Sequence, residues 1–485
     1  MAELSNKKIR RFKLAPPPLE LPVYGKIDPR KCSFFGRTNY EAALEEKKFI
    51  FGIKRNDRRR HIYSIGKSGV GKTKFLELLI RQDIAYNYGL CVIDPHGDLI
   101  SNLLDFIPEN RINDVVLIDP SNSQYPISFN PLSNTDPSVK YQLTQDLIEV
   151  MKKQFGANWG PRVEHVFRFT CLALFDYSDA TMRGMISMLT DRSYRQHVSE
   201  FIEDEMVKKF WAIEFADWSE KFDAEAIIPL VNKLTQFLAN PMIRNIFGQK
   251  KNKIDLEELM NSRKIILINL AKGNLGEENS SFFGSIFLTK IKQAGMARAK
   301  IPEDQREDFY LYVDEFQNLA TESFENLLAE SRKFGFCLTL SHQYIKQLSP
   351  QIQSSVLGNA GTIITFRVSG EDGVKLEPEM APLFKVNDMI NLGLRQFYVK
   401  MTIDGETYDP FSGETLKVLP PTHKSNREKI IKQSQEKYAV PVAEAKRAMK
   451  EEEEKIWRSA EERQAIEKNK SNENESSQDN SQPLV

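Results

Sequence analysis

The chain has 485 residues, which is room for roughly two to four domains and for a core large enough to support an enzyme. Hydrophobic residues make up 41% and charged residues 28%, so a wholly disordered, collagen-like or disulfide-scaffold protein is excluded. Lys and Arg together number 67, as do Asp and Glu, so the net charge is zero and a histone-like nucleic-acid binder is also excluded.

The first part of the chain, residues 1–60, is locally basic, with 16 Lys and Arg against 7 Asp and Glu. The charge is concentrated in KKIRRFK (7–13) and KRNDRRR (54–60), and Pro16, Pro17, Pro18 and Pro22 follow the first cluster. This composition predicts a mostly extended segment with a short helix over residues 39–48, and we expect regular structure to begin near His61. The basic excess is that of a solvated flank or of a surface that meets anionic lipid, DNA or a membrane partner.

The sequence does not predict secretion or a membrane span. No apolar stretch follows the basic start, as a signal peptide requires, and the longest apolar runs fall well below the ~18 residues of a membrane helix. The four cysteines form neither a metal-binding pattern nor a disulfide framework: Cys32, Cys91, Cys171 and Cys337. We therefore expect buried thiols in a cytoplasmic protein, recruited to the inner face of a membrane by a partner if at all.

From His61 onward, short apolar runs alternate with helical patterns, which is typical of an α/β protein with a mainly parallel sheet. The runs that predict strands are 61–65, 90–94, 114–119, 264–270, 309–315, 336–341 and 362–368. Helices are predicted near 279–299, 319–334 and 370–382.

Two segments break this alternation. Residues 137–249 lack strand-like patterns and contain helical ones such as RVEHVFRFTCLALF, which predicts an inserted all-α domain between the two halves of the α/β domain, 61–136 and 250–425. Residues 426–485 are predicted to form a charged helix followed by a disordered tail, since almost no apolar residue follows Asn469.

The strongest chemical signal directly follows the first predicted strand and opens a helix. The octet Gly66-Lys67-Ser68-Gly69-Val70-Gly71-Lys72-Thr73 fits the phosphate-binding loop pattern G-x-x-x-x-G-K-[ST]. Glycines allow successive backbone N–H groups to point at phosphate oxygens, and the helix N-terminus adds positive partial charge. We expect Lys72 to reach the β- and γ-phosphates of ATP and Thr73 to ligate Mg²⁺.

A second, acidic element ends the strand FYLYVDE (309–315). Asp314 is expected to hold the magnesium shell, and Glu315 to orient and deprotonate the attacking water. An Asp-Glu pair at a strand end is weak evidence alone, because it is often a solvated end or a helix cap. Together with Lys72 it predicts nucleotide hydrolysis.

Seven segments together resemble the HerA/FtsK superfamily, and most of all the conjugative coupling proteins of type IV secretion, the TraD/TraG type. These are GKSGVGKT (66–73), DPHGDL (94–99), NWGPR (158–162), LAKGNLG (270–276), YVDEFQNLA (312–320), SRKFGFCLTLSHQ (331–343) and GTIITFRV (361–368). The resemblance implies a RecA-like motor domain, an inserted all-α domain, a homo-hexameric ring and ATP-driven movement of DNA without sequence preference. Proteins of this type typically begin with membrane helices, which are not found here. This departure argues against direct anchoring at a secretion channel and leaves two alternatives, a soluble variant or one that docks on a separate membrane partner.

The resemblance also implies roles for three further residues. Gln343 corresponds to the glutamine that senses the γ-phosphate, and its alternative role is a strand-end cap. Arg332 corresponds to the arginine finger, which a neighbouring subunit would supply, and its alternative role is a surface salt bridge. Arg367 is a second candidate for the finger, and the sequence does not choose between the two arginines.

The acidic segment after the second strand contains Asp94, His96 and Asp98, which resemble a metal-ligand set. Their position at the carboxyl edge of a parallel sheet favours contact with the nucleotide or with a neighbouring subunit instead. Among the other histidines, His61 has no recognisable partner in the sequence and is expected to be structural or exposed.

Three functions remain open at this point. They are a DNA-translocating coupling ATPase, a HerA-like DNA repair or segregation motor, and a secretion-assembly ATPase that acts on protein. The segment NWGPR and the inserted helices favour the coupling ATPase, whereas the missing membrane helices point the other way.

Overall fold

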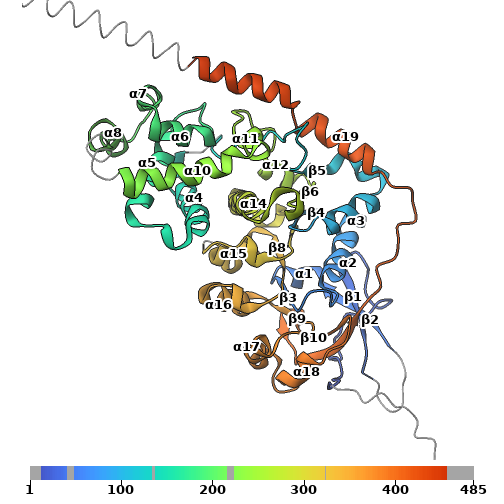
Figure 1. Ribbon diagram of the computed structural model, residues 1–485. Helices are drawn as coiled ribbons and strands as arrows, with labels where there is room; N and C mark the ends of the chain where they lie inside the picture. The colour runs from blue at the N-terminus through green and yellow to red at the C-terminus, as the bar shows by residue number, and fades with distance from the viewer. Residues whose placement is uncertain (1–11, 41–47, 134–136, 216–222, 323, 456–485) are drawn as a thin grey trace, which may run out of the picture. The chain divides into compact units, whose positions relative to one another are not determined.

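The computed structural model describes residues 12–40, 48–133, 137–215, 223–322 and 324–455. The chain divides into two compact units, each built from two stretches of sequence (Figure 1). The first unit comprises residues 1–121 and 255–437, and the second comprises residues 122–254 and 438–485.

The first unit is built on one mixed sheet, in which the strands from β9 (Thr362–Thr365) to the edge strand β5 (Val115–Ile118) are parallel. In spatial order these strands are β9, β3 (Ile62–Ile65), β8 (Phe336–His342), β7 (Phe309–Val313), β4 (Gly89–Asp94), β6 (Ile265–Asn269) and β5. All seven predicted strands are therefore confirmed. Their nearly continuous apolar runs follow from burial on both faces of a parallel sheet.

An antiparallel extension continues the sheet beyond β9. Its strands, from the edge inward, are β2 (Ile50–Lys54), β1 (Cys32–Thr38), β12 (Phe411–Thr415) and β10 (Gln396–Ile403), and the short β11 (Glu406–Thr407) pairs with β10. The expectation that regular structure begins near His61 is wrong, because β1 and β2 precede it. Their pairing depends on β12, nearly four hundred residues later in the chain, so no local pattern marks them. Most of the helix predicted over 39–48 lies outside the described residues.

Helices cover both faces of this sheet, with α2 and α3 on one side and α14, α15 and α16 on the other (Figure 1). The helices of this unit are α1 (Arg55–Arg58), α2 (Lys72–Ala85), α3 (Asp98–Phe106), α12 (Leu256–Asn261), α13 (Lys272–Leu275), α14 (Glu277–Ala297), α15 (Phe324–Glu330), α16 (Pro350–Asn359), α17 (Gly370–Met380), α18 (Val386–Ile390) and α19 (Arg427–Tyr438). The predicted apolar stripe of α2 is buried, with Phe75, Leu76, Leu79, Ile80 and Ile84 at most 1% exposed. The loop segment 66–73 therefore leads into a rigid, well-packed helix.

The second unit is helical in the described part of residues 137–249, where no strand is found. Its α-helices are α4 (Lys140–Phe155), α5 (Pro161–Phe175), α6 (Met182–Thr190), α7 (Arg192–Ser199), α8 (Glu205–Lys209), α10 (Ile228–Ala239) and α11 (Pro241–Phe247). Local capping explains several of the starts. The carboxylate of Asp191, for example, accepts hydrogen bonds from the backbone N–H groups of Ser193 and Tyr194 at the start of α7.

The cysteines are free and buried, as the sequence predicts. Among the helices in the described ranges, none is both long and apolar enough to cross a membrane. The tail predicted to be disordered from Asn469 lies outside the described residues.

Candidate functional site

The phosphate-binding loop begins where β3 ends at Ile65 and runs into the first turn of α2. Gly69 and Gly71 adopt φ angles of +74° and +120°, which side chains with a Cβ atom rarely allow. At Gly66, φ is ordinary, but a Cβ atom would lie 2.6 Å from the Cβ of Phe366. The spacing of the glycines is therefore dictated by backbone conformation at two positions and by close packing at the third.

Lys72 is held inside the loop. Its ammonium donates hydrogen bonds to the carbonyl oxygens of Gly66 at 2.5 Å and Lys67 at 3.0 Å, and the residue is 5% exposed. Burial lowers the pKa of Lys72, and the nearby carboxylates of Glu315 and Asp314 oppose that shift. The ammonium of Lys72 therefore already lies at the loop, where phosphate oxygens can replace the two carbonyl oxygens as its hydrogen-bond acceptors.

The acidic pair lies directly after β7, close to the loop. Asp314 is 3% exposed, and its Oδ2 accepts a hydrogen bond of 3.3 Å from the hydroxyl of Thr73. Burial, followed by the charges of Glu315 and Asp94, raises the pKa of Asp314 to about 6. A hydroxyl and a carboxylate at this separation are oxygen ligands of the kind that Mg²⁺ prefers, so the residues present fit a magnesium ion beside the phosphates.

Glu315 is fixed by two amide side chains. Its Oε1 accepts a hydrogen bond from Gln343 Nε2 and its Oε2 accepts one from Gln317 Nε2, both at 2.6 Å. The backbone of Glu315 has φ +47°, an uncommon conformation for this residue type that occurs preferentially at functional sites. Each carboxylate oxygen keeps a lone pair, so the group can still accept a proton from a water molecule. The sequence analysis did not identify Gln317, although its spacing of two residues from Glu315 was a usable signal.

The phosphate-binding loop, Glu315 and Gln343 line one cavity of about 230 Å³. Its lining consists of Ser68, Gly69, Gly71, Lys72, Thr73, Lys74, His96, Glu315 and Gln343. The strands that bring these groups together, β3, β7 and β8, are parallel neighbours, so their carboxyl ends meet at one edge of the sheet. The cavity is therefore lined both by a loop that can bind phosphates and by a carboxylate that can accept a proton.

The segment DPHGDL does not form a metal cluster. The carboxylate of Asp94 accepts the backbone N–H groups of His96 at 2.9 Å and Ile100 at 3.1 Å, which fixes the turn into α3. His96 lines the cavity, whereas Asp98 is exposed on the first turn of α3. Throughout the described ranges, no group of three or more His, Cys, Asp or Glu residues is arranged to hold a metal ion.

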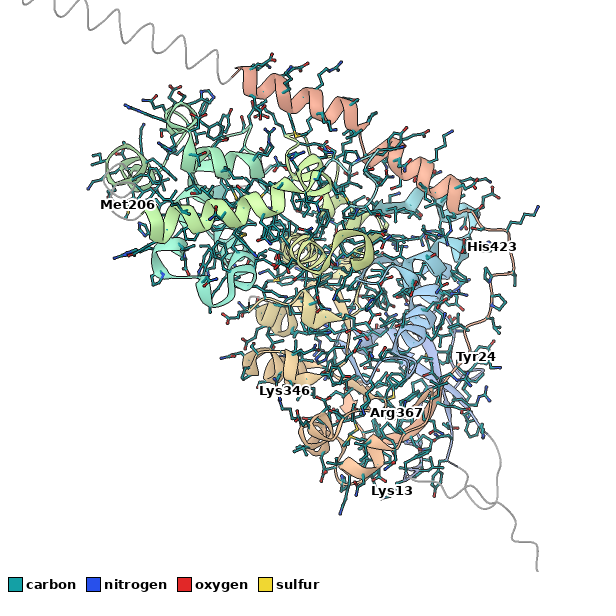
Figure 2. The ribbon with its side chains drawn as sticks, in the orientation of Figure 1. Lys13, Tyr24, Met206, Lys346, Arg367 and His423 are labelled. Carbon is teal, nitrogen blue, oxygen red and sulfur yellow. The ribbon has the colours of Figure 1, made fainter. Side chains whose placement is uncertain are left out.

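The two candidate fingers lie at opposite edges of the sheet. Arg367 follows β9 at the carboxyl edge, and its carbonyl accepts the backbone N–H of Lys67 at 2.8 Å, while its side chain is exposed (Figure 2). Arg332 lies on the 3₁₀ turn η9 (Ser331–Phe334), before the first residue of β8. Since β8 has seven residues, it separates Arg332 from its own phosphate-binding loop by roughly 20 Å, at about 3.3 Å per residue.

The chain matches a family model and is similar in fold to solved structures. A family model described as the type IV secretion-system coupling protein DNA-binding domain matches residues 50–377, more than half of the chain. The solved structure of plasmid coupling protein TrwB with a non-hydrolysable ATP analogue is 14% identical, with a TM-score of 0.55, and the match covers 86% of this chain and 98% of that one. The unbound bacterial conjugative coupling protein TrwBdeltaN70 is also 14% identical, with a TM-score of 0.54 over 78% of this chain and 88% of that one.

These structural likenesses confirm the predicted fold class, a RecA-type α/β fold with a mainly parallel sheet. No curated protein matches the sequence.

Proposed function

The chain belongs to the family of type IV secretion-system coupling proteins, and on that premise we propose that it is an ATP-driven motor that moves DNA during conjugative transfer. The observation that carries the proposal is the single cavity where Lys72, Thr73, Glu315 and Gln343 meet, with Asp314 hydrogen-bonded to Thr73. The TrwB structures in complex with ADP and Mg²⁺ and with an ATP analogue support ATP and Mg²⁺ as the ligands of this cavity.

Hydrolysis follows from the positions of these groups. The loop amides and Lys72 bind the β- and γ-phosphates, and Thr73 and Asp314 would hold Mg²⁺, which when bound neutralises charge on the transferred phosphoryl group. Water attacks the γ-phosphorus and gives its proton to Glu315, while the bond to the β-phosphate oxygen breaks to leave ADP and phosphate. Gln343 both orients Glu315 and lies where it can contact the γ-phosphate.

We further propose that the active form is a homo-hexameric ring, as the family resemblance implies. In such a ring Arg332 would act on a neighbouring subunit, because it lies too far from its own phosphate-binding loop to act there. A guanidinium supplied by the neighbouring subunit would complete each site. Recruitment of the ring to the inner face of a membrane by a separate membrane partner is part of the same proposal. The basic cluster 54–60 is only partly available to such a partner or to DNA, because Arg55 and Arg58 are buried and pair with Asp83, which corrects the expectation of a solvated basic flank there.

Two substitutions test the chemistry of the site. Lys72→Ala is expected to abolish productive ATP binding, whereas Glu315→Gln is expected to bind ATP without turnover, because the amide cannot accept the proton of water. Glu325→Gln is the matched control, since Glu325 is an exposed carboxylate on α15 outside the cavity, and it should hydrolyse ATP like the wild type. Nucleotide-binding and turnover assays measure all three variants. Wild-type turnover in Glu315→Gln would show that another group is the base.

The proposed cargo is tested by measuring ATP turnover with and without single- and double-stranded DNA. Stimulation by DNA of unrelated sequences is expected, because no base-reading module is recognisable in the chain. If an oligomer that hydrolyses ATP neither binds DNA nor responds to it, a secretion-assembly ATPase acting on protein takes the place of both the coupling motor and the repair motor.

A further inference from the structure

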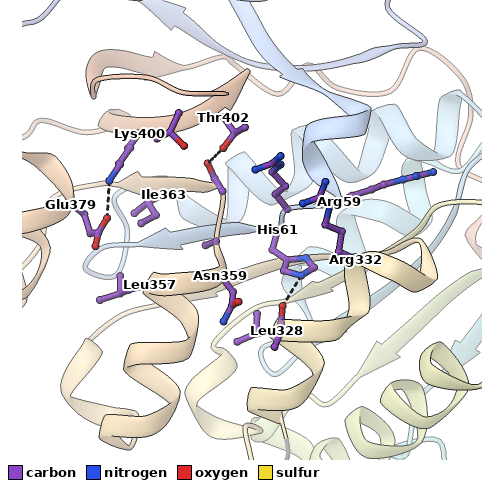
Figure 3. Close-up of a pocket in the computed structure, with 16 residues that line it drawn as sticks. Arg59, His61, Leu328, Arg332, Leu357, Asn359, Ile363, Glu379, Lys400 and Thr402 are labelled. Carbon is purple, nitrogen blue, oxygen red and sulfur yellow. Dashed lines mark hydrogen bonds and ion pairs between the residues drawn. The ribbon is translucent and has the colours of Figure 1, made fainter. Parts of the chain in front are cut away.

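At the amino edge of the sheet, opposite the nucleotide cavity, a second cavity of about 510 Å³ is lined by both His61 and Arg332 (Figure 3). His61 is the last residue before β3, the strand that leads into the phosphate-binding loop. Its side chain is 2% exposed, although the sequence around it is strongly basic. This buried imidazole is used by none of the steps derived above.

The hydrogen bonds of His61 define its tautomer. Nδ1 accepts the backbone N–H of Leu338 at 3.2 Å, so this nitrogen carries no proton. Burial lowers the pKa of His61 to about 4, and the ring is therefore neutral with its proton on Nε2. Nε2–H points at two acceptors, the carbonyl oxygen of Leu328 and the hydroxyl oxygen of Ser331, each at 3.2 Å.

These partners flank Arg332 in the sequence. Leu328 lies in the last turn of α15, Ser331 directly precedes Arg332, and Leu338 lies on β8 just after the turn. Leu328 and Ser331 are both buried, whereas the side chain of Arg332 is exposed and forms no ion pair with any described residue. The buried neighbours therefore fix the backbone around Arg332, while its exposed guanidinium can contact a partner.

The backbone of His61 is also unusual. Its φ is +66°, a conformation that non-glycine residues hold only where the surrounding structure imposes it. Its N–H donates to the carbonyl of Arg58 at 3.0 Å and its carbonyl accepts the N–H of Thr362 at 3.3 Å. The backbone of His61 is therefore held rigidly. Its imidazole links the start of β3 to the segment that carries Arg332.

We propose that His61 is a positioning residue that holds Arg332 for action on the nucleotide of a neighbouring subunit. The inference rests on the proposed function, because it requires that Arg332 acts across the interface. Misplacement of a reacting group by about 1 Å can cost about 10²-fold in rate, so a loosened turn should slow hydrolysis without affecting nucleotide binding.

His61→Asn keeps the hydrogen bond made by one ring nitrogen of His61 and removes those made by the other. Asn tolerates a positive φ, and its Oδ1 can replace Nδ1 as the acceptor for Leu338, but it has no group that reaches Leu328 and Ser331. We expect wild-type ATP affinity and turnover reduced by about 10- to 100-fold, within the range of misplacement effects. His61→Gln places an amide donor near the position of Nε2 and should recover part of the rate.

Mixed rings give the decisive measurement, because they distinguish a role in the residue's own site from a role in the neighbour's. Glu315→Gln subunits have an inactive site but an intact His61 and Arg332. In rings co-assembled from Glu315→Gln and His61→Asn, an intact finger can reach an intact site. ATP turnover should therefore exceed that of rings made of either variant alone. Rings of Glu315→Gln with Arg332→Ala are the control and should recover activity in the same way.

The possible results distinguish a failure of the role of His61 from a failure of the proposed function. Recovery with Arg332→Ala but not with His61→Asn would overturn the role of His61 and leave the proposed function intact. Loss of ATP binding in His61→Asn would show that His61 supports its own phosphate-binding loop and would also overturn the inference. If neither mixture recovers activity while the wild type hydrolyses ATP, both the finger across the interface and the role of His61 fall.

Discussion

Arg332→Ala is expected to bind ATP as the wild type does and to hydrolyse it about 10³ to 10⁵ times more slowly, the range that arginine fingers contribute. Binding survives because Arg332 lies at the amino edge of the sheet, one full strand away from the loop that holds the phosphates in its own chain. Turnover is lost because the charge that develops on the transferred phosphoryl group is no longer neutralised by the neighbouring subunit. Nucleotide affinity and single-turnover rates, measured on the assembled oligomer, separate these two effects.

Lys333→Ala is the matched control, since Lys333 is an exposed cation on the same turn. A surface salt bridge lost from this turn would change stability by only about 0.2 to 1 kcal/mol and could not produce an effect of the expected size. If Arg332→Ala stays within a few-fold of the wild type and Arg367→Ala is inactive, the finger is Arg367, whose carbonyl already contacts the phosphate-binding loop.

The parallel core was predictable because each strand is buried on both faces and therefore forms one continuous apolar run. The antiparallel extension was not, since its outer strands β1 and β2 join the sheet through a partner that lies far away in the sequence. β1 pairs with β12, with Arg37 opposite Glu414, so the information that makes residues 32–38 a strand lies far along the chain.

The same distinction applies to the site. Lys72, Thr73, Asp314 and Glu315 could be identified because each motif is local and directly follows a predicted strand. His61 could not, since its three side-chain partners lie 267 to 277 residues away in the sequence. The proposal of Arg332 rather than Arg367 as the finger required the directions of β8 and β9, which place one candidate at each edge of the sheet.

The affinity of the assembled protein for DNA is expected to fall by about 10³ to 10⁵ between 50 and 200 mM salt, if roughly 6 to 10 phosphates are contacted. A chain with 67 positive and 67 negative residues has no overall attraction to DNA, so it must concentrate Lys and Arg on the surface that meets the phosphates. Each neutralised phosphate then releases a counterion, and this release makes binding dependent on salt but not on sequence.

Measurement of DNA binding and of DNA-stimulated ATP turnover across that salt range tests this expectation, with turnover in the absence of DNA as the internal control. Basal turnover should change less, because Lys72 and Glu315 are buried and salt screens buried charges less than an exposed surface. A mainly apolar contact with a protein cargo would keep or increase its affinity as salt rises. Stimulation that does not fall with salt, or an ATP-hydrolysing oligomer that ignores DNA even at 50 mM salt, would therefore contradict a DNA motor, because a phosphate-binding surface must lose affinity as counterions compete for it.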